Sequence, residues 1–402
     1  MDRPRHVVVT GPLAPFAVGF EENLAEYGYK CKAASDHLYV MAQVSRWLVT
    51  ERLGADDLSA SVLERFPDWR WAAGYVSSSS STRMSRLVDY LVGIGAVPRF
   101  EPAVASTPVE LLMERYRRYL AEERALSTSS IRNYAGVARD FLARLTTEDE
   151  LDLEALTTAE VSEFVLSECR RCKVASAKAA TTRLRALLRF LYVVGLTPND
   201  LAGAVPSVAS WRLASLPKAI EAFDVARMLR SCDRRRAMGR RDFAVLMILS
   251  RLGLRAGEVA KLQLDSIDWR SGEVVVQGKG SREDRLPLPV DVGEAIVGWL
   301  QRGRPQCADR SLFTRVRAPQ QGLSSGGVSV IVTHACDRAG LAPAGAHRLR
   351  HTAATGMLRA GGSLAEVGQV LRHQRAETTA IYAKVDRRAL VAVVRPWPGG
   401  VA

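Results

Sequence analysis

Apolar residues recur every three to four positions along much of this chain, which is the period of an amphipathic α-helix. The pattern is clearest in LLMERYRRYLAEERA (111–125), SSIRNYAGVARDFLARL (129–145) and AATTRLRALLRFLYVVG (179–195). Runs of this length with this period favour helices over strands. The pattern therefore predicts a mainly α protein with a small all-helical domain around these three segments.

Two proline-bearing connections, over residues 96–108 and 197–219, interrupt the helical pattern. Domain boundaries usually fall in such segments. We expect an N-terminal helical module, a small helical domain, a larger C-terminal domain and a short tail. These parts cover residues 1–97, 109–198, 218–390 and 391–402.

The sequence of the N-terminal module resembles that of the helical domain that follows it. Two of its stretches, LAEYGYKCKAASDHLYVMAQVSRWL and RLVDYLVGIGAVP, align in order with LAEERALSTSSIRNYAGVARDFL and LLRFLYVVGLTP. The alignment pairs Tyr39 with Tyr134 and Gly95 with Gly195. Two matches in order favour a duplicated helical domain. Amphipathic helices also resemble one another by chance, so a module of another kind is the alternative.

The charge of the chain narrows the choice of partner. Its 402 residues carry a formal net charge of +13, with a pI near 9.8. This charge implies a polyanionic partner, and nucleic acid is preferred over an anionic membrane because the sequence shows no lipid anchor. A charge that serves solubility alone is the other alternative. The uncharged run over residues 7–20 is interrupted by Pro12 and Pro15 and lacks a small-residue cleavage site. We therefore expect a cytoplasmic protein without a membrane span.

The six cysteines are scattered, and a chain of 402 residues needs no disulfides to fold. Cys169 and Cys172 form a CxxC pair, but a structural zinc site would need a second pair of ligands, and the sequence offers none. No GxxxxGK[ST] phosphate-binding loop occurs either. We expect reduced thiols, no metal and no other cofactor.

The densest candidate chemistry lies in residues 347–382, which include His347, Arg350, His373 and Tyr382. Attack by a phenol on a phosphodiester places charge on two nonbridging oxygens, and without metal ligands cations must stabilise that charge. A guanidinium suits this role, because it stays ionised and can bind two oxygens at once. His347 and Arg350 are spaced i and i+3 at the start of a predicted helix, so they would face the same way.

Two motifs upstream add to this set. The stretch LSRLGLRAGEVAKLQLDSIDW supplies Arg255, a second cation for the phosphate, and Glu258. Glu258 lies one helical turn beyond Arg255 and is expected to orient its guanidinium. The stretch VVVQGKGSREDRLPLP supplies Lys279 at a predicted hairpin tip.

Four motifs follow one another along the chain: LGLRAGE, GKG before RLPL, HRLRHT, and LRH before Tyr382. In these motifs and their order, the chain resembles the tyrosine recombinases of the phage-integrase and Xer type. The resemblance covers about residues 109–390. It implies a mostly helical catalytic domain with a small three-stranded sheet made by DSIDW, EVVVQG and DRLPLP. It also implies that residues 109–198 are a core-binding, SAM-like domain, and that residues 1–97 are a second such domain or an arm-binding domain.

The resemblance implies a role for each candidate. Tyr382 would attack DNA and become linked to a 3′ phosphate, and His347 would assist removal of the phenol proton or orient the phenol. His373 would donate a hydrogen bond to a nonbridging oxygen, and Lys279 would protonate the leaving 5′ oxygen. His334 and His351 are interpreted as ordinary polar residues. Arg372 stands where the family usually has glycine, and the sequence suggests no role for it.

Two clusters are candidates for DNA phosphate contacts. The first opens a predicted helix, where hydroxyls, an amide and a helix N-terminus can meet phosphates. Simple N-capping by Ser127 or Thr128 is the alternative reading. The second is a run of arginines over residues 227–241 opposed only by Asp233, for which a solvated helix face is the alternative. The candidates are Thr128, Ser129, Ser130, Arg132, Asn133, Arg234, Arg235, Arg240 and Arg241.

Three functions fit these residues. One is a site-specific recombinase, integrase or transposase. It would exchange strands of double-stranded DNA through a Holliday junction, as a homotetramer or together with related recombinases. Another is a type IB topoisomerase-like enzyme, and the third is a non-catalytic DNA-binding protein. The complete residue set argues against the third function. The repeated modules favour the first function. The apolar ALVAVV of the tail also favours it, because tails in this family dock on a neighbouring protomer. A tail that folds back on its own chain is the alternative.

Overall fold

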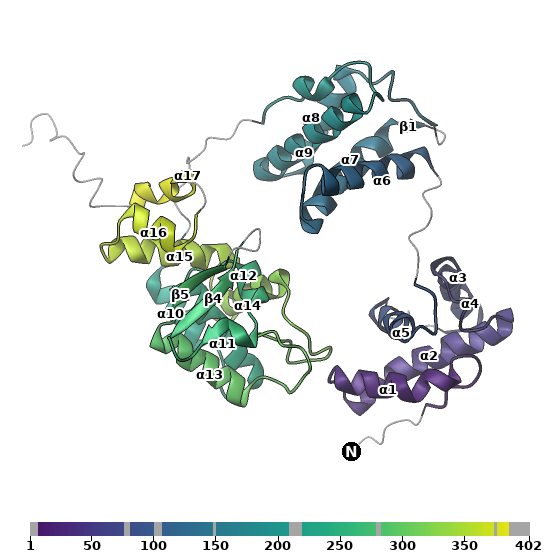
Figure 1. The fold of residues 1–402 in the computed structure, drawn as a ribbon, viewed down its shortest axis with the longest axis horizontal. Coiled ribbons are helices and arrows are strands. Elements are labelled where there is room, and N and C mark those ends of the chain that lie inside the picture. Colours follow the sequence, from purple (N-terminus) through teal and green to yellow (C-terminus); the bar gives the residue numbers. More distant parts are fainter. Residues whose placement is uncertain are drawn as a thin grey trace, which may run out of the picture. The chain divides into compact units, whose positions relative to one another are not determined.

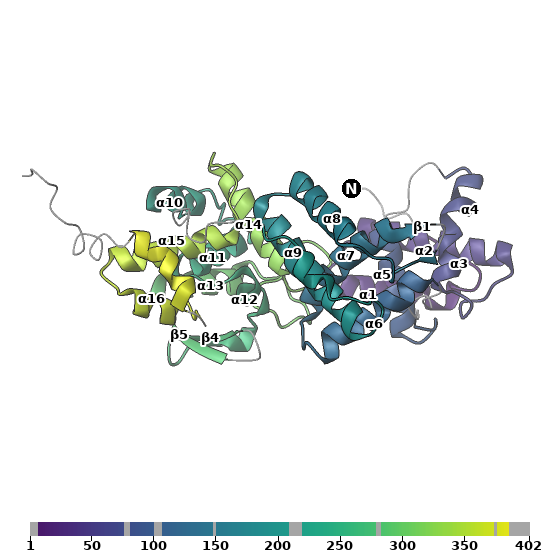
Figure 2. The ribbon, with the colours of Figure 1, turned by 90° about the horizontal axis from the view of Figure 1, so that it is seen from above.

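The structure is a computed structural model of the chain (Figure 1, Figure 2). Two compact units make up the chain, one of residues 100–214 and the other of residues 1–99 together with 215–402. The unit boundaries fall within the two proline-bearing connections. Among the described residues, no helix is long and apolar enough to cross a membrane. The described ranges are 7–75, 81–99, 107–147, 150–208, 219–278, 283–373 and 376–385.

Residues 14–93 form a small helical array. Helix α2 packs against α1, α4 and α5. Its apolar positions recur at the helical period and bury Met41, Val44, Trp47 and Leu48 completely. Burying these side chains holds the array together, since each contributes roughly 1.5–3 kcal/mol of transfer free energy. The elements are η1 (Ala14–Phe16), α1 (Ala17–Glu26), α2 (Cys31–Glu51), α3 (Ala60–Glu64), α4 (Phe66–Ala72) and α5 (Ser81–Gly93).

Residues 107–205 form a second helical array, in which α7 packs against α6 and α9. Its core includes Phe141 and Phe164, whose rings meet edge to face with centroids 5.2 Å apart. Helix α6 begins with a capping box, in which Thr107 and Glu110 each accept a hydrogen bond from the other's backbone N–H. The elements are α6 (Pro108–Glu122), α7 (Thr128–Leu145), β1 (Thr146–Thr147), β2 (Glu150–Leu151), α8 (Thr158–Arg171), α9 (Val174–Val193) and η2 (Leu201–Ala204).

Residues 219–385 form the array that carries the candidate catalytic residues. Helix α11 lies at its centre and packs against α13 and α15, which bury Val245, Ile248 and Leu249. The elements are α10 (Ala222–Arg230), α11 (Ala237–Arg251), α12 (Ala256–Lys261), η3 (Leu264–Ser266), β3 (Ile267–Asp268), β4 (Glu273–Gln277), β5 (Glu283–Pro287), α13 (Val290–Arg302), α14 (Ser325–Arg338), α15 (Ala346–Arg359), α16 (Leu364–Val370), α17 (Ala376–Thr379) and η4 (Ala380–Val385).

The three strands pair antiparallel in the order β3-β4-β5. Val274 and Val276 alternate with more exposed neighbours along β4 and point into the core. The predicted mainly α class with a three-stranded sheet is therefore confirmed. Lys279 lies between β4 and β5 in the sequence, but outside the described residues, as does the predicted tail over 391–402.

Several helices among the described residues end in the same hydrogen-bonded turn, including α1, α4, α14 and α15. At the ends of α5 and α9, Gly95 and Gly195 have φ values of 73° and 75°. In each turn, the N–H groups of the glycine and of the next residue bond back to carbonyls of the helix. Glycine is common here, because the left-handed conformation brings no Cβ clash. Helix α16 ends in the same way, but on Arg372, whose φ is 56°.

Candidate active site

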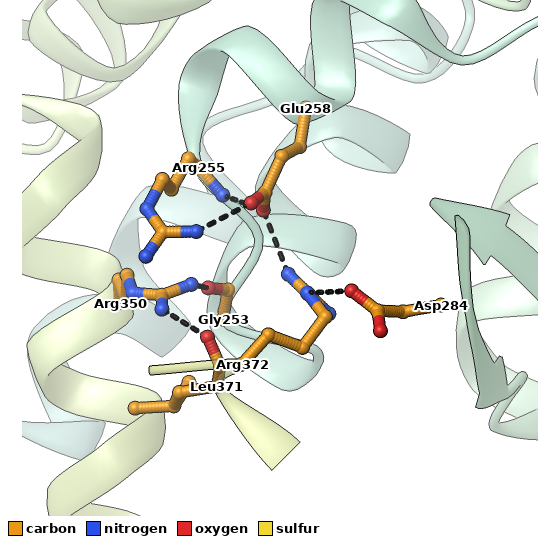
Figure 3. Close-up of polar contacts among 7 residues, drawn as sticks. All are labelled: Gly253, Arg255, Glu258, Asp284, Arg350, Leu371 and Arg372. Atoms are coloured by element: carbon orange, nitrogen blue, oxygen red, sulfur yellow. Dashed lines mark hydrogen bonds and ion pairs between the residues drawn. The ribbon is translucent and has the colours of Figure 1, made fainter. Parts of the chain in front are cut away.

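Helix α15 carries the centre of the site. His347 and Arg350 lie in its first turns, as their spacing predicted, and Arg350 is only 1% exposed. The Nη1 of Arg350 donates to the Gly253 carbonyl at 2.7 Å, and its Nη2 donates to the Leu371 carbonyl (Figure 3). One guanidinium thus joins α15 to the turn before α12 and to the turn after α16.

Arg255 lies at the start of α12 and contacts Glu258 one turn further on (Figure 3). Its Nη1 donates to Glu258 Oε1 at 2.6 Å, and its backbone N–H donates to Glu258 Oε2 at 2.8 Å. The predicted contact between the two residues is therefore present. The Glu258 side chain is 7% exposed and that of Arg255 is 46% exposed. The carboxylate is the fixed partner, and the guanidinium remains open to a ligand.

The charged groups of the site carry a surplus of positive charge. Burial raises the pKa of the Glu258 carboxyl, but the Arg255 backbone N–H and the charge of Arg372 outweigh it, so this pKa lies below its usual value. Burial, followed by the charge of Arg255, lowers the pKa of Arg350 to about 10. Glu258 is therefore ionised and Arg350 still protonated at neutral pH. An anion such as a phosphate would relieve the repulsion among the guanidiniums.

Tyr382 lies in η4 and is 2% exposed. Its ring belongs to a small apolar cluster with Leu358 of α15 and Val367 of α16. The Tyr382 Oη lies 2.8 Å from His351 Nδ1. Burial raises the pKa of Tyr382, and the charge of Arg350 opposes this shift. The phenol is therefore protonated at neutral pH and needs a proton acceptor before it can act as a nucleophile.

Two histidine rings, those of His351 and His373, lie against the ring of Tyr382, and a third, that of His347, lies against His351. The rings of His347 and His351 lie 4.5 Å apart, and the ring of His373 stacks parallel to that of Tyr382 at 6.4 Å. His373 Nδ1 lies 2.7 Å from Thr379 Oγ1. Burial, reinforced by neighbouring positive groups, lowers the pKa of His351 and of His373 to about 4 and also lowers that of His347. These rings are neutral at pH 7 and can accept a proton.

Comparison with known proteins adds to this geometry. The Phage integrase family matches residues 218–388, and the Phage integrase, N-terminal SAM-like domain matches residues 113–194. The putative integrase/recombinase y4rA of Sinorhizobium fredii is 40% identical over 394 residues, which cover 97% of this chain and 95% of that protein. The chain belongs to the phage integrase family. The tyrosine recombinase XerD of Mycobacterium tuberculosis is 30% identical over 72% of this chain and 96% of that protein.

Solved structures of this family share the fold. A lambda integrase dimer bound to a COC′ core site matches with a TM-score of 0.55 at 16% identity, over 81% of this chain and 92% of that one. The XerH site-specific recombinase bound to a palindromic difH substrate matches with a TM-score of 0.55 at 19% identity, over 70% and 83%. The sequence relatives and the family match, rather than these structures, make the chain a member of the tyrosine recombinases, which are DNA strand-transferring enzymes. Site-specific recombination is the function that this membership supports.

His351 is the histidine whose Nδ1 contacts Tyr382 Oη. The sequence reasoning placed His347 beside the phenol and interpreted His351 as an ordinary polar residue, so it missed this contact. The i, i+4 spacing of the two histidines could have indicated that both rings lie on one face of α15.

Arg372, for which the sequence suggested no role, lies beside the charged groups of the recombinase site. Its Nη2 lies 2.7 Å from Glu258 Oε2, and its Nε lies 3.7 Å from Asp284 Oδ2 on β5 (Figure 3). Glu258 therefore contacts two arginines, one from its own helix and one from the turn after α16.

The first cluster of predicted DNA contacts opens helix α7 of the recombinase. Ser127 caps this helix by accepting a hydrogen bond from the Ser130 N–H at 3.4 Å, so the capping alternative is realised. The side chains of Thr128, Ser129, Arg132 and Asn133 are exposed, whereas Ser130 is half-buried. The cap and an exposed polar surface thus occur together.

The second cluster is less uniformly positive than the sequence suggested. Arg234 and Arg235 are exposed, and the half-buried Arg240 donates to the carbonyl of Arg302. Arg241 is 9% exposed, and its guanidinium pairs at 2.8 Å with Asp242, which lies just beyond the arginine run. This corrects the prediction for Arg241, because a buried and neutralised guanidinium is not available to a DNA phosphate.

Proposed function

We propose that this chain is a site-specific DNA recombinase that cuts and rejoins DNA through a covalent link between Tyr382 and a 3′ phosphate. The observation that carries the proposal is the hydrogen bond between Tyr382 Oη and the neutral His351, in a site charged by Arg350. A phenol, a proton acceptor and a fixed cation are the groups that attack on a phosphodiester requires.

In the proposed cleavage step, Tyr382 Oη forms a bond to phosphorus as the bond from phosphorus to the 5′ oxygen breaks. The phenol proton passes to His351 Nδ1. The leaving 5′ oxygen takes a proton from Lys279, as the resemblance implies. The reverse step, attack of a 5′ hydroxyl on the phosphotyrosine, rejoins DNA and restores the phenol.

The cations would stabilise the pentacoordinate phosphorus between these steps. Arg255 has a half-exposed guanidinium directed by Glu258, and Arg350 is fixed by two carbonyl groups. His347 and His373 would donate hydrogen bonds to the nonbridging oxygens. Because the phosphotyrosine conserves the energy of the phosphodiester, rejoining would need no ATP, and the arginines would stabilise the transition state without a metal.

Strand exchange through a Holliday junction would need four such sites on paired DNA. The lambda integrase tetramer bound to a Holliday junction is similar to this chain, with a TM-score of 0.54. This likeness supports a homotetramer, or an assembly with related recombinases, as the working form. Tyr382 is buried in the free chain, so we infer that DNA binding or assembly moves η4 and exposes the phenol.

A covalent-trapping experiment tests the proposed function. The chain is incubated with a supercoiled plasmid carrying the DNA that flanks its gene, and the reaction is stopped with detergent. We expect a DNA adduct on Tyr382, found as a phosphotyrosyl peptide and formed equally in EDTA. Tyr382→Phe should form no adduct, while its DNA affinity changes by less than about twofold, because the phosphate-binding cations remain.

Two results would contradict the proposal. One is an adduct that persists in Tyr382→Phe, and the other is cleavage that EDTA abolishes and added metal restores. Plasmid relaxation by the chain without strand exchange between two sites would favour the topoisomerase-like alternative.

We further propose that residues 109–198 bind DNA through the exposed start of α7, with Arg234, Arg235 and Arg240 of the 218–390 domain adding phosphate contacts. Residues 1–97 would act as a second DNA-binding module. The two sequence matches that run in the same order support a duplicated domain. The turn shared by Gly95 and Gly195 adds little, because α1, α4, α14 and α15 end in the same way. Tyr39 and Tyr134 also add little, since Tyr39 is 48% exposed and Tyr134 packs against its core.

A truncated chain that starts at Ala105 tests the N-terminal module. We expect a shorter DNA footprint, weaker binding and a smaller dependence of affinity on salt, because fewer phosphates release counterions. Adduct formation on Tyr382 should persist at saturating DNA. An unchanged footprint and salt slope with loss of assembly would instead make residues 1–97 a protein-interaction module.

A further inference from the structure

Arg372 combines two unfavourable features. Its φ of 56° lies in the left-handed region, where the equivalent turns of α5 and α9 carry Gly95 and Gly195. Arg52 has a similar φ of 58°, but its side chain is exposed, whereas that of Arg372 is 9% exposed. A strained backbone and a buried charge both oppose folding. Stability alone therefore does not explain an arginine at this position.

The buried guanidinium of Arg372 is also incompletely satisfied. Its Nη2 donates to Glu258 Oε2 at 2.7 Å. Among the described residues, its Nε and Nη1 have no hydrogen-bond partner, although Nε lies 3.7 Å from Asp284 Oδ2. Native structures leave few buried donors unpaired. The strongest contact of Arg372 is thus the one to Glu258, the residue that also holds Arg255.

We propose that Arg372 is a positioning residue that fixes the Glu258 carboxylate and, through it, the Arg255 guanidinium. The inference rests on the proposed function, in which Arg255 binds the phosphate that Tyr382 attacks.

The geometry of the Glu258 carboxylate carries this inference. Oε1 accepts from Arg255 Nη1, and Oε2 accepts from both the Arg255 backbone and Arg372 Nη2 (Figure 3). Without Arg372, both oxygens would be held by Arg255 alone, and the last torsion of a glutamate is soft. Arg372 adds a hydrogen bond to Oε2 from a second segment, the turn after α16, so the orientation of the carboxylate no longer depends on Arg255 alone. It also takes part of the negative charge of Glu258, which leaves more of the charge of Arg255 for a phosphate.

The test uses the full chain and the plasmid that carries the gene-flanking DNA, with cleavage measured in a single turnover at saturating DNA. Arg372→Gly removes the guanidinium and gives the turn its usual residue, and a melting curve checks that the variant is folded. We expect cleavage to slow by at least about tenfold, with DNA affinity changed by less than about twofold. Arg304→Gln is the control, because Arg304 is a half-buried arginine that donates to backbone carbonyls outside the site. It should cleave at the native rate.

A double-mutant cycle shows whether Arg372 acts through Glu258. In a Glu258→Gln background, Arg372→Gly should slow cleavage by less than about twofold further, because the carboxylate it positions is already gone. An equal loss of rate in both backgrounds would overturn the inference, and so would native cleavage by Arg372→Gly. If the native chain forms no adduct on Tyr382, the proposed function fails instead.

The contact with Asp284 offers a second route, through the hairpin that carries Lys279. A substrate with sulfur in place of the 5′ bridging oxygen distinguishes the two routes once the cleavage position is mapped. A thiolate leaves without being protonated, so this substrate compensates for a displaced Lys279 but not for a displaced Arg255. We expect the defect of Arg372→Gly to persist on it. Recovery of the native rate would assign Arg372 to the hairpin and overturn the inference.

Discussion

The two halves of the candidate site are built from different interactions. Around Arg350, Arg255 and Glu258, side chains are held by ion pairs and by hydrogen bonds to backbone carbonyls. Around Tyr382, neutral rings stack and share hydrogen bonds, and burial lowers the pKa of His351 and raises that of the phenol. The first half stores positive charge before DNA arrives, and the second half excludes charge.

This difference separates two tasks of phosphoryl transfer. A transition state that gains negative charge is best stabilised by cations already fixed in place, because no reorganisation is then needed during the reaction. The nucleophile needs surroundings without a nearby charge, because a cation that stabilised the ionised phenol would make it a weaker base and a weaker nucleophile. The neutral half keeps the proton on Tyr382 until an acceptor such as His351 takes it.

A substitution in the charged half of the site should reduce the cleavage rate most. Arg350→Lys keeps a positive charge but cannot donate to both the Gly253 and Leu371 carbonyls. We expect single-turnover cleavage to fall by about 10²–10³-fold, the usual cost of losing a fixed donor to a transition state. The melting temperature should also fall, because a buried carbonyl loses its partner. Equal losses in DNA affinity and in cleavage rate would contradict this role of the charged half, since Arg350 would then serve DNA binding alone.

A substitution in the neutral half of the site should reduce the cleavage rate less. His351→Asn can keep a hydrogen bond to Tyr382 Oη but cannot take up a proton at neutral pH. We expect cleavage to slow by about 10²-fold, the lower end of the range for general base catalysis. The rate should then rise with pH towards the pKa of the phenol itself. His347→Asn is the matched variant on the same helix, and a rate that rises with pH in this variant but not in His351→Asn would return the role of base to His347.

The smallest expected effect concerns stability in acid. The pKa of His351 and of His373 is about 4 in the folded chain and 6.5 ordinarily, so between these values the unfolded chain binds more protons. Stability therefore rises with pH across this window and is lost as pH falls from 6.5 to about 4. We expect ~1–2 kcal/mol per histidine after solvent screening. Denaturant unfolding at several pH values measures it. Replacing both histidines by asparagine should reduce the dependence and leave the part that comes from His37 and His347, whose pKa values burial also lowers.

Much of the fold could be read from the sequence, because periodicity is a local property. The helical segments and the placement of His347 and Arg350 on one helix follow from residues close together in the chain, whereas the three strands were expected from the family resemblance. The contact between Arg255 and Glu258 was predictable for the same reason, since it spans a single helical turn.

The residues that sequence reasoning missed depend on tertiary contacts. His351 meets Tyr382 across 31 positions, and Arg372 meets Glu258 across 114. Which of two histidines reaches a phenol depends on where η4 packs against α15, and no local pattern encodes that packing. Arg241 is buried because the rotation of α11 about its axis turns this side chain inward, and a run of charges in the sequence does not show that rotation.

The burial of Tyr382 has a consequence for chemical labelling. Reagents that nitrate or iodinate tyrosine act on accessible phenols, so in the free protein they should modify Tyr39 and Tyr192, which are 48% and 45% exposed, and spare Tyr382, which is 2% exposed. A phenol that leaves its pocket on DNA would join the modified set. The labelling pattern would therefore report the movement of η4 on any bound DNA, even one that the enzyme does not cut.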